Sequence, residues 1–161
     1  MKKLRFLILI PVLITAVYLV GPEVDIDELD ASVPDIDLTG EALEAYISQK
    51  EEGIKNLKED NQARIVWFND SLKQKTEYAV VYLHGFSASQ GEGSPVHTNF
   101  ARRYGCNLYL ARLHEHGLHT KDALLDMTPR KLMGSAAEAV AIGRQLGEKV
   151  ILMSTSTGGT L

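Results

Sequence analysis

Apolar residues along this chain occur in short runs separated by longer segments with helical spacing. The runs at 78–83 and 150–153 contain almost no polar side chains, a pattern typical of strands buried on both faces. Two further strands are predicted at 64–69 and 107–113, and the second of these alternates between apolar and polar positions. These segments form the predicted sheet, and 150–153 is expected to be one of its inner strands.

Helical spacing predicts three helices around these strands. They lie at about 41–61, from about residue 94 to Gly105, and from Pro129 to Gly147. Thr39 and Thr128 stand where they can cap the first and the third helix. Helices of this length between strands imply right-handed crossovers. We therefore predict an α/β fold with a mostly parallel sheet flanked by helices.

The beginning of the chain has a different pattern. Lys2, Lys3 and Arg5 precede an uncharged apolar stretch at 6–20. At about 1.5 Å per residue, this stretch is somewhat shorter than the roughly 30 Å hydrocarbon core of a bilayer. We expect an uncleaved membrane anchor that holds the body outside the cytoplasm, and the alternative is a cleaved signal peptide.

Domain boundaries follow from these patterns. Residues 1–22 are assigned to the signal peptide or membrane anchor, and the strongly acidic segment 23–39 to a solvated linker. Residues 40–161 form the predicted domain. The net charge of −4 includes the basic start of the chain, so the body is more acidic still, which argues against nucleic acid as a partner. The single cysteine, Cys106, excludes an internal disulfide and a cysteine zinc cluster.

The strongest candidate for chemistry follows the apolar run at 150–153. The residues 154–158 match the pattern G-x-S-x-G, with serine in place of the first glycine. A serine at such a strand-to-helix bend has its hydroxyl exposed at the carboxyl end of the sheet. Ser156 is therefore the predicted nucleophile. A Ser/Thr/Gly loop without chemistry is the alternative interpretation of this short motif alone.

A second loop is expected beside the first. The run at 78–83 leads directly into His84, Gly85 and Phe86, and the carboxyl ends of parallel strands lie on the same edge of a sheet. Acyl transfer needs a nucleophile together with N–H groups that stabilise the negative charge on the carbonyl oxygen. The backbone N–H groups of Phe86 and Thr157 are the predicted oxyanion donors.

With these two loops in this order, the chain resembles the α/β-hydrolase family of serine esterases and lipases over about 64–161. The resemblance implies a small-molecule acyl ester as substrate, an acyl-enzyme on Ser156, and no cofactor or metal. It also implies a structural role for His84, and a position for His116 and Gly117 near the substrate, although a plain surface loop is the other description of that segment. Substrate and acyl-chain length stay open.

The family's catalytic acid and histidine follow the nucleophile in the chain. Every histidine here precedes Ser156, and only five residues follow it. We therefore expect the amino-terminal part of a longer hydrolase, with negligible turnover by this segment alone.

Three other interpretations of the sequence are open. One is a binding protein on the same scaffold without chemistry. A second is a metal site at His114, His116 and His119, which lacks the aspartate expected before the last histidine. A phosphate-binding loop at 154–159 is the least favoured, because no lysine follows the glycines.

Overall fold

The computed structural model describes residues 2–21 and 28–161, with side chains given from residue 9 onwards. Its centre is a four-stranded sheet with the strand order β1-β3-β2-β4. The strands are β1 (Arg64–Val66), β2 (Thr76–Leu83), β3 (Asn107–Leu110) and β4 (Gly147–Ser154). The α/β class predicted from the sequence is confirmed.

The sheet is mixed, which corrects the expectation of a mostly parallel one. β2 pairs in parallel with both β3 and β4, but β1 runs antiparallel to β3. β1 and β2 are joined by a polar turn and not by a crossover helix. A short connection of this kind does not impose the parallel direction that a helical crossover gives.

β4 is also not the inner strand that its apolar run predicted. Among the described residues, β4 pairs with β2 alone and forms the edge of the sheet. Val150, Ile151 and Met153 are half-buried, and the Leu152 side chain is 55% exposed. The apolar run correctly predicted a strand. Hydrophobicity alone did not show whether that strand has neighbours on both sides or on one side only.

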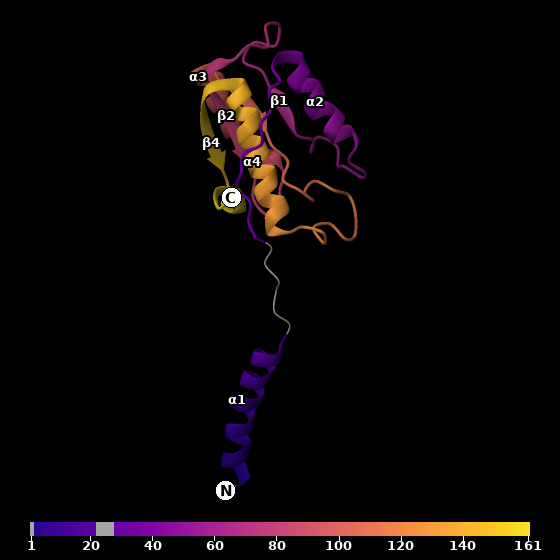
Figure 1. Cartoon of the computed structure of the whole chain (residues 1–161), viewed down its shortest axis with the longest axis vertical. Helices are drawn as coiled ribbons and strands as arrows, with labels where there is room; N and C mark the ends of the chain where they lie inside the picture. Colours follow the sequence, from indigo (N-terminus) through magenta and orange to yellow (C-terminus); the bar gives the residue numbers. More distant parts are fainter. Residues whose placement is uncertain (1, 22–27) are drawn as a thin grey trace.

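Helices cover the two faces of the sheet unequally. The α-helices are α1 (Lys2–Val20), α2 (Gly40–Glu52), α3 (Val96–Tyr104) and α4 (Pro129–Leu146), with short 3₁₀ turns η1 (Gln90–Gly93) and η2 (Ser156–Gly159). α2 and α4 lie side by side on one face, and α3 covers part of the other (Figure 1).

The alternation of side chains along β2 explains how one strand contributes to both faces. Ala79, Val81 and Leu83 belong to the larger core, which they share with α2 and α4. Val80 and Tyr82 point to the other face and pack with Ala101 of α3. β2 is therefore an inner strand that is buried on both sides, as the sequence predicted.

Two of the predicted helices have the expected limits, and the first is shorter than expected. α4 begins at Pro129 after Thr128, whose hydroxyl oxygen accepts a hydrogen bond from the Lys131 N–H at 3.3 Å. α2 ends at Glu52, just before Gly53, whereas the sequence predicted a helix that continued to residue 61 with Gly53 near its middle. Gly53 has a low intrinsic helix propensity, and the chain turns away from the helix there. Thr39 precedes α2 without a side-chain capping bond.

Part of the predicted linker packs on the domain. The part of the predicted linker at 23–27 lies outside the described residues, and 28–39 has no regular secondary structure. Ile36 and Leu38 are half-buried against the larger core. Because the segment is mostly acidic, the sequence analysis did not predict that these two apolar side chains pack on the domain immediately before α2.

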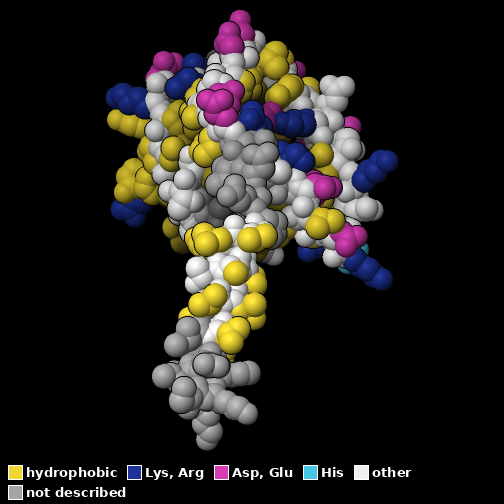
Figure 2. All heavy atoms as spheres, turned by 60° about the horizontal axis from the view of Figure 1, so that its bottom comes forward, with side chains coloured by type: hydrophobic (Ala, Val, Ile, Leu, Met, Phe, Trp, Pro, Cys, Tyr) yellow, Lys and Arg dark blue, Asp and Glu magenta, His cyan; other side chains and the backbone are white. Residues whose placement is uncertain are grey.

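α1 carries an apolar surface that packs against nothing described. Val20, Tyr18 and Leu19 are 86%, 84% and 74% exposed, and apolar side chains are visible along the described part of this helix (Figure 2). Within residues 2–21 and 28–161, no helix combines the length and apolar character needed to cross a membrane.

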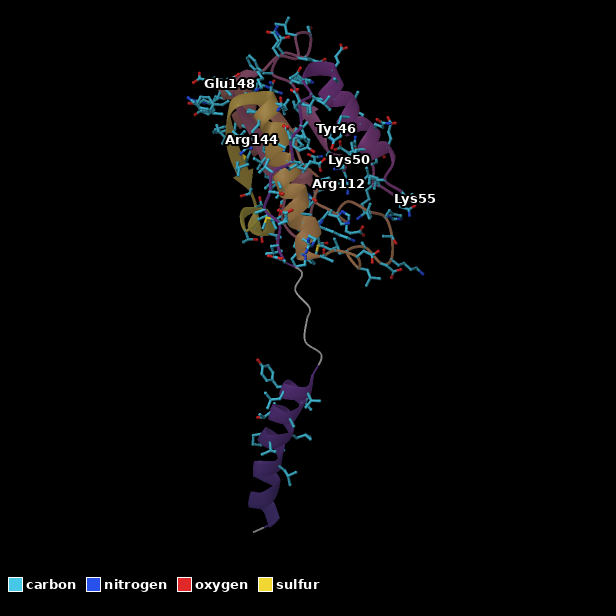
Figure 3. All side chains as sticks on the ribbon, viewed as in Figure 1. Tyr46, Lys50, Lys55, Arg112, Arg144 and Glu148 are labelled. Atoms are coloured by element: carbon cyan, nitrogen blue, oxygen red, sulfur yellow. The ribbon has the colours of Figure 1, made fainter. Side chains whose placement is uncertain are left out.

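A buried ion pair joins α2 to the end of β3. Arg112 donates from Nε and Nη2 to the Glu51 carboxylate at 2.7 and 3.1 Å, and both side chains are less than a tenth exposed. Glu51 also accepts a hydrogen bond from the Ala63 N–H. Arg112 lies with Tyr46 and Lys50 in the polar region between α2 and α4 (Figure 3). Breaking such a pair leaves one charge buried without compensation.

We predict that Arg112→Gln lowers the free energy of unfolding by about 3–5 kcal/mol. Urea unfolding followed by circular dichroism measures it. The matched control is Lys149→Gln, which removes the exposed pair with Glu77 and is expected to cost less than about 1 kcal/mol. Equal losses in the two variants would contradict the prediction.

Candidate active site

The two candidate loops leave neighbouring strands at the same level of the sheet. β2 and β4 are parallel partners, and Leu83 is paired with Ser154 at their carboxyl ends. Gly85 therefore lies two residues beyond one member of this pair, and Ser156 two residues beyond the other. The Thr155 N–H donates to the Leu83 carbonyl oxygen at 3.1 Å and continues the pairing into the bend.

The bend at Ser156 has the backbone conformation expected for a serine presented at a sharp turn. The φ angle of Ser156 is +47°, in the left-handed region where a side chain is disfavoured. The residue is exposed, and η2 starts there. Within the described chain, its hydroxyl has no hydrogen-bond partner. Strain of this kind is often stored at functional sites.

Two glycines allow the bend to approach the end of β2. A Cβ atom on Gly158 would clash with the Leu83 carbonyl oxygen and lie 2.7 Å from the His84 carbonyl oxygen. A Cβ atom on Gly85 would lie 3.4 Å from the Ser156 Cβ atom. At Gly158 the backbone at the end of β2 fills the space that a Cβ atom would need, whereas at Gly85 the nearest atoms belong to the side chains of Glu92 and Ser156.

The two predicted oxyanion donors are available on this edge. Phe86 follows Gly85, and Thr157 is in the first turn of η2, where backbone N–H groups lack helical partners. Among the described residues, neither N–H donates a hydrogen bond. A free backbone amide is the kind of donor that a developing oxyanion needs.

His84 holds the loop and does not contact the nucleophile. Its Nε2 accepts a hydrogen bond from the Leu113 N–H at 3.1 Å, so the proton is on Nδ1, which donates to the Gly85 carbonyl oxygen at 2.9 Å. Burial lowers the pKa of His84, and the neighbouring His116 adds to the effect. The structural role expected for this histidine matches these contacts.

His116 is buried against the same loop. Its ring lies 4.9 Å from the His84 ring and 6.2 Å from the Phe86 ring, and the side chain is 1% exposed. It is therefore not a surface residue. The proposed metal site is not formed: within the described part of the chain, no group of three or more histidine, cysteine or acidic side chains is placed to hold a metal ion.

Sequence reasoning missed the side chains that tie the two loops together, which are Tyr82, Glu92 and Thr155. The Tyr82 Oη lies 2.9 Å from the Thr155 Oγ1 and 3.5 Å from a Glu92 carboxylate oxygen. A tyrosine in a buried run needs a partner for its hydroxyl, and that signal was present in the sequence. Nothing in the sequence pattern singled out Glu92.

No protein-family model matches this chain, and no curated protein has a sequence that matches it.

We predict that Ser156→Gly is more stable than Ser156→Ala by about 0.5–1 kcal/mol. Glycine adopts a positive φ without the steric cost that a Cβ atom imposes. Urea unfolding of the two variants measures the difference, and Ser154→Gly against Ser154→Ala is the control within β4, where glycine should be the less stable member. A more stable alanine at position 156 would refute the strained bend.

A second expectation concerns pH. Because the pKa of His84 is lowered in the folded state by burial, only the unfolded chain takes up this proton as pH falls below about 6.5. The free energy of unfolding should therefore decrease from pH 6.5 downwards, and His114, whose pKa burial also lowers, acts in the same direction. Unfolding at a series of pH values tests the trend. An NMR midpoint for the His84 ring at or above 6.5 would contradict it.

Proposed function

We propose that this chain carries the nucleophile and oxyanion donors of a serine hydrolase that acts on carboxylic esters, built on an α/β-hydrolase scaffold. The observation that carries the proposal is the positive φ of the exposed Ser156, in a bend packed against Gly85. The free N–H groups of Phe86 and Thr157 also support the proposal, because acyl transfer needs donors that stabilise the oxyanion.

The proposed reaction has two stages. The Ser156 hydroxyl oxygen attacks the ester carbonyl, the Phe86 and Thr157 N–H groups stabilise the oxyanion, and the alcohol leaves with a proton. Water then attacks the acyl-enzyme and releases the acid, which restores the serine. One oxyanion donor is typically worth about 3 kcal/mol of barrier.

Deprotonating Ser156 requires a general base. No described histidine contacts its hydroxyl, since His84 is committed to Gly85 and Leu113 and His116 is packed behind Phe86. We therefore place the histidine and the carboxylate of the proposed mechanism beyond these 161 residues, in the order that the resemblance implies. The same observation favours the second candidate, a binding protein on this scaffold without catalysis.

Residues 1–22 are proposed to direct export and to attach the body to a membrane or to be removed as a signal peptide. The supporting observations are the basic residues at the start, the acidic body and the exposed apolar side chains of α1. Amino-terminal sequencing of the mature protein separates the two outcomes.

We predict that a fluorophosphonate probe labels Ser156 in the full-length protein, because an activated serine hydroxyl displaces fluoride from phosphorus. Intact-mass spectrometry after labelling should show one adduct, absent in Ser156→Ala and retained in Ser154→Ala. Ser154 is the matched control because it is exposed and lies two residues away.

The two candidate functions give opposite results. A full-length protein that stays unlabelled, with a fold confirmed by circular dichroism, supports the binding protein and rejects the hydrolase. The isolated 161-residue chain should hydrolyse p-nitrophenyl acetate only at the background rate. Hydrolysis by that chain, lost in Ser156→Ala, would show that the base lies within it.

A further inference from the structure

Glu92 occupies a position that the proposed chemistry does not explain. It belongs to η1 and is exposed, yet its carboxylate turns towards the two loops. The Gly85 N–H donates to Glu92 Oε2 at 2.8 Å. A Cβ atom on Gly85 would lie 3.2 Å from both carboxylate oxygens and 3.4 Å from the Ser156 Cβ. The carboxylate and the serine are therefore on the same side of the glycine.

The contacts of Gly85 fix both peptide planes that meet at its Cα. The Glu92 carboxylate holds the N–H of the plane before it. The carbonyl of the following plane accepts hydrogen bonds from the His84 Nδ1–H and from the Ala88 N–H at 3.3 Å. Because a trans peptide is planar, holding this carbonyl also sets the direction of the Phe86 N–H. Glycine is otherwise the residue with the widest choice of φ and ψ.

The same carboxylate reaches the serine bend through one intermediate. Tyr82 Oη is 3.5 Å from Glu92 Oε2 and 2.9 Å from Thr155 Oγ1, immediately before Ser156. η1 is itself held, because the Gln90 carbonyl oxygen binds the buried His97 ring and Gln90 Nε2 donates to the Asp60 carbonyl oxygen. Glu92 thus connects a fixed turn to both sides of the candidate site.

We propose that Glu92 is a positioning residue for the Phe86 oxyanion donor. By accepting from the Gly85 N–H it fixes the peptide plane before the glycine, and so limits the φ rotation at Gly85 that would otherwise let the following plane, with the Phe86 N–H, change its direction relative to the rest of the site. The inference rests on the proposed hydrolase function and adds to it a residue that forms no hydrogen bond with Ser156 in the described structure. The role requires a hydrogen-bond acceptor and not a negative charge. A negative charge near a developing oxyanion would oppose catalysis, so a neutral acceptor of the same shape should serve at least as well.

The test compares Glu92→Met with Glu92→Gln in the full-length protein. The two side chains have similar length, but only glutamine retains an oxygen that accepts from the Gly85 N–H. Because Glu92 is exposed, neither change removes core packing. We expect Glu92→Met to lower kcat about 10- to 100-fold with KM changed less than about threefold, because the donor is misplaced in the transition state. Glu92→Gln should stay within about threefold of the wild type.

An independent readout uses the 161-residue chain and no substrate. Hydrogen exchange at the Gly85 amide should be faster in Glu92→Met than in the wild type, and protected in Glu92→Gln. Circular dichroism and urea unfolding establish that both variants are folded.

The outcomes separate this inference from the proposed function. A wild-type protein that neither hydrolyses esters nor takes the fluorophosphonate rejects both. An active, labelled wild type whose Glu92→Met variant keeps its kcat overturns the positioning role alone. Equal losses in Glu92→Met and Glu92→Gln also overturn it, since they would show that the charge and not the acceptor matters.

Discussion

The arrangement of this molecule depends on the parallel pairing of β2 with β4. Side-by-side strands that run in the same direction deliver the segments after them to one edge, and the pairing of Leu83 with Ser154 sets their relative height. Everything proposed for the site follows from that register. A shift of one residue would turn each side chain of β4 to the opposite face and would separate Ser156 from Gly85.

The sequence was informative wherever a local signal and the tertiary structure agreed. The apolar run of β2 and the cap and proline at the start of α4 predicted elements that the structure contains. The closeness of the loop at His84–Phe86 and the bend at Ser156 also followed from sequence order, because parallel strands place their carboxyl ends together. Gly85 and Gly158 confirm this at the level of single atoms.

Other features were not accessible because they arise from contacts between distant segments. The edge position of β4 depends on which strands pair. The direction of β1 depends on the short connection between β1 and β2. Ile36 and Leu38 pack against the larger core, but the acidic composition of their segment predicts no such packing. Glu92 is recognisable only once the turn that carries it is folded against Gly85. Hydrogen bonds of this kind between distant segments produce no periodic pattern in the sequence.

The edge position of β4 has a consequence for how the 161-residue chain behaves in solution when it is studied alone. In the described sheet, the eight residues of Gly147–Ser154 present one row of backbone groups without a strand partner, and an open row of that kind is a template for intermolecular pairing. Glu148 and Lys149 are exposed at the start of the strand and discourage this pairing by the cost of desolvating their charges, whereas Leu152 further along does not. In the 161-residue chain taken alone, association through the backbone is therefore favoured along the second half of β4, and a strand that paired there would cover the open row.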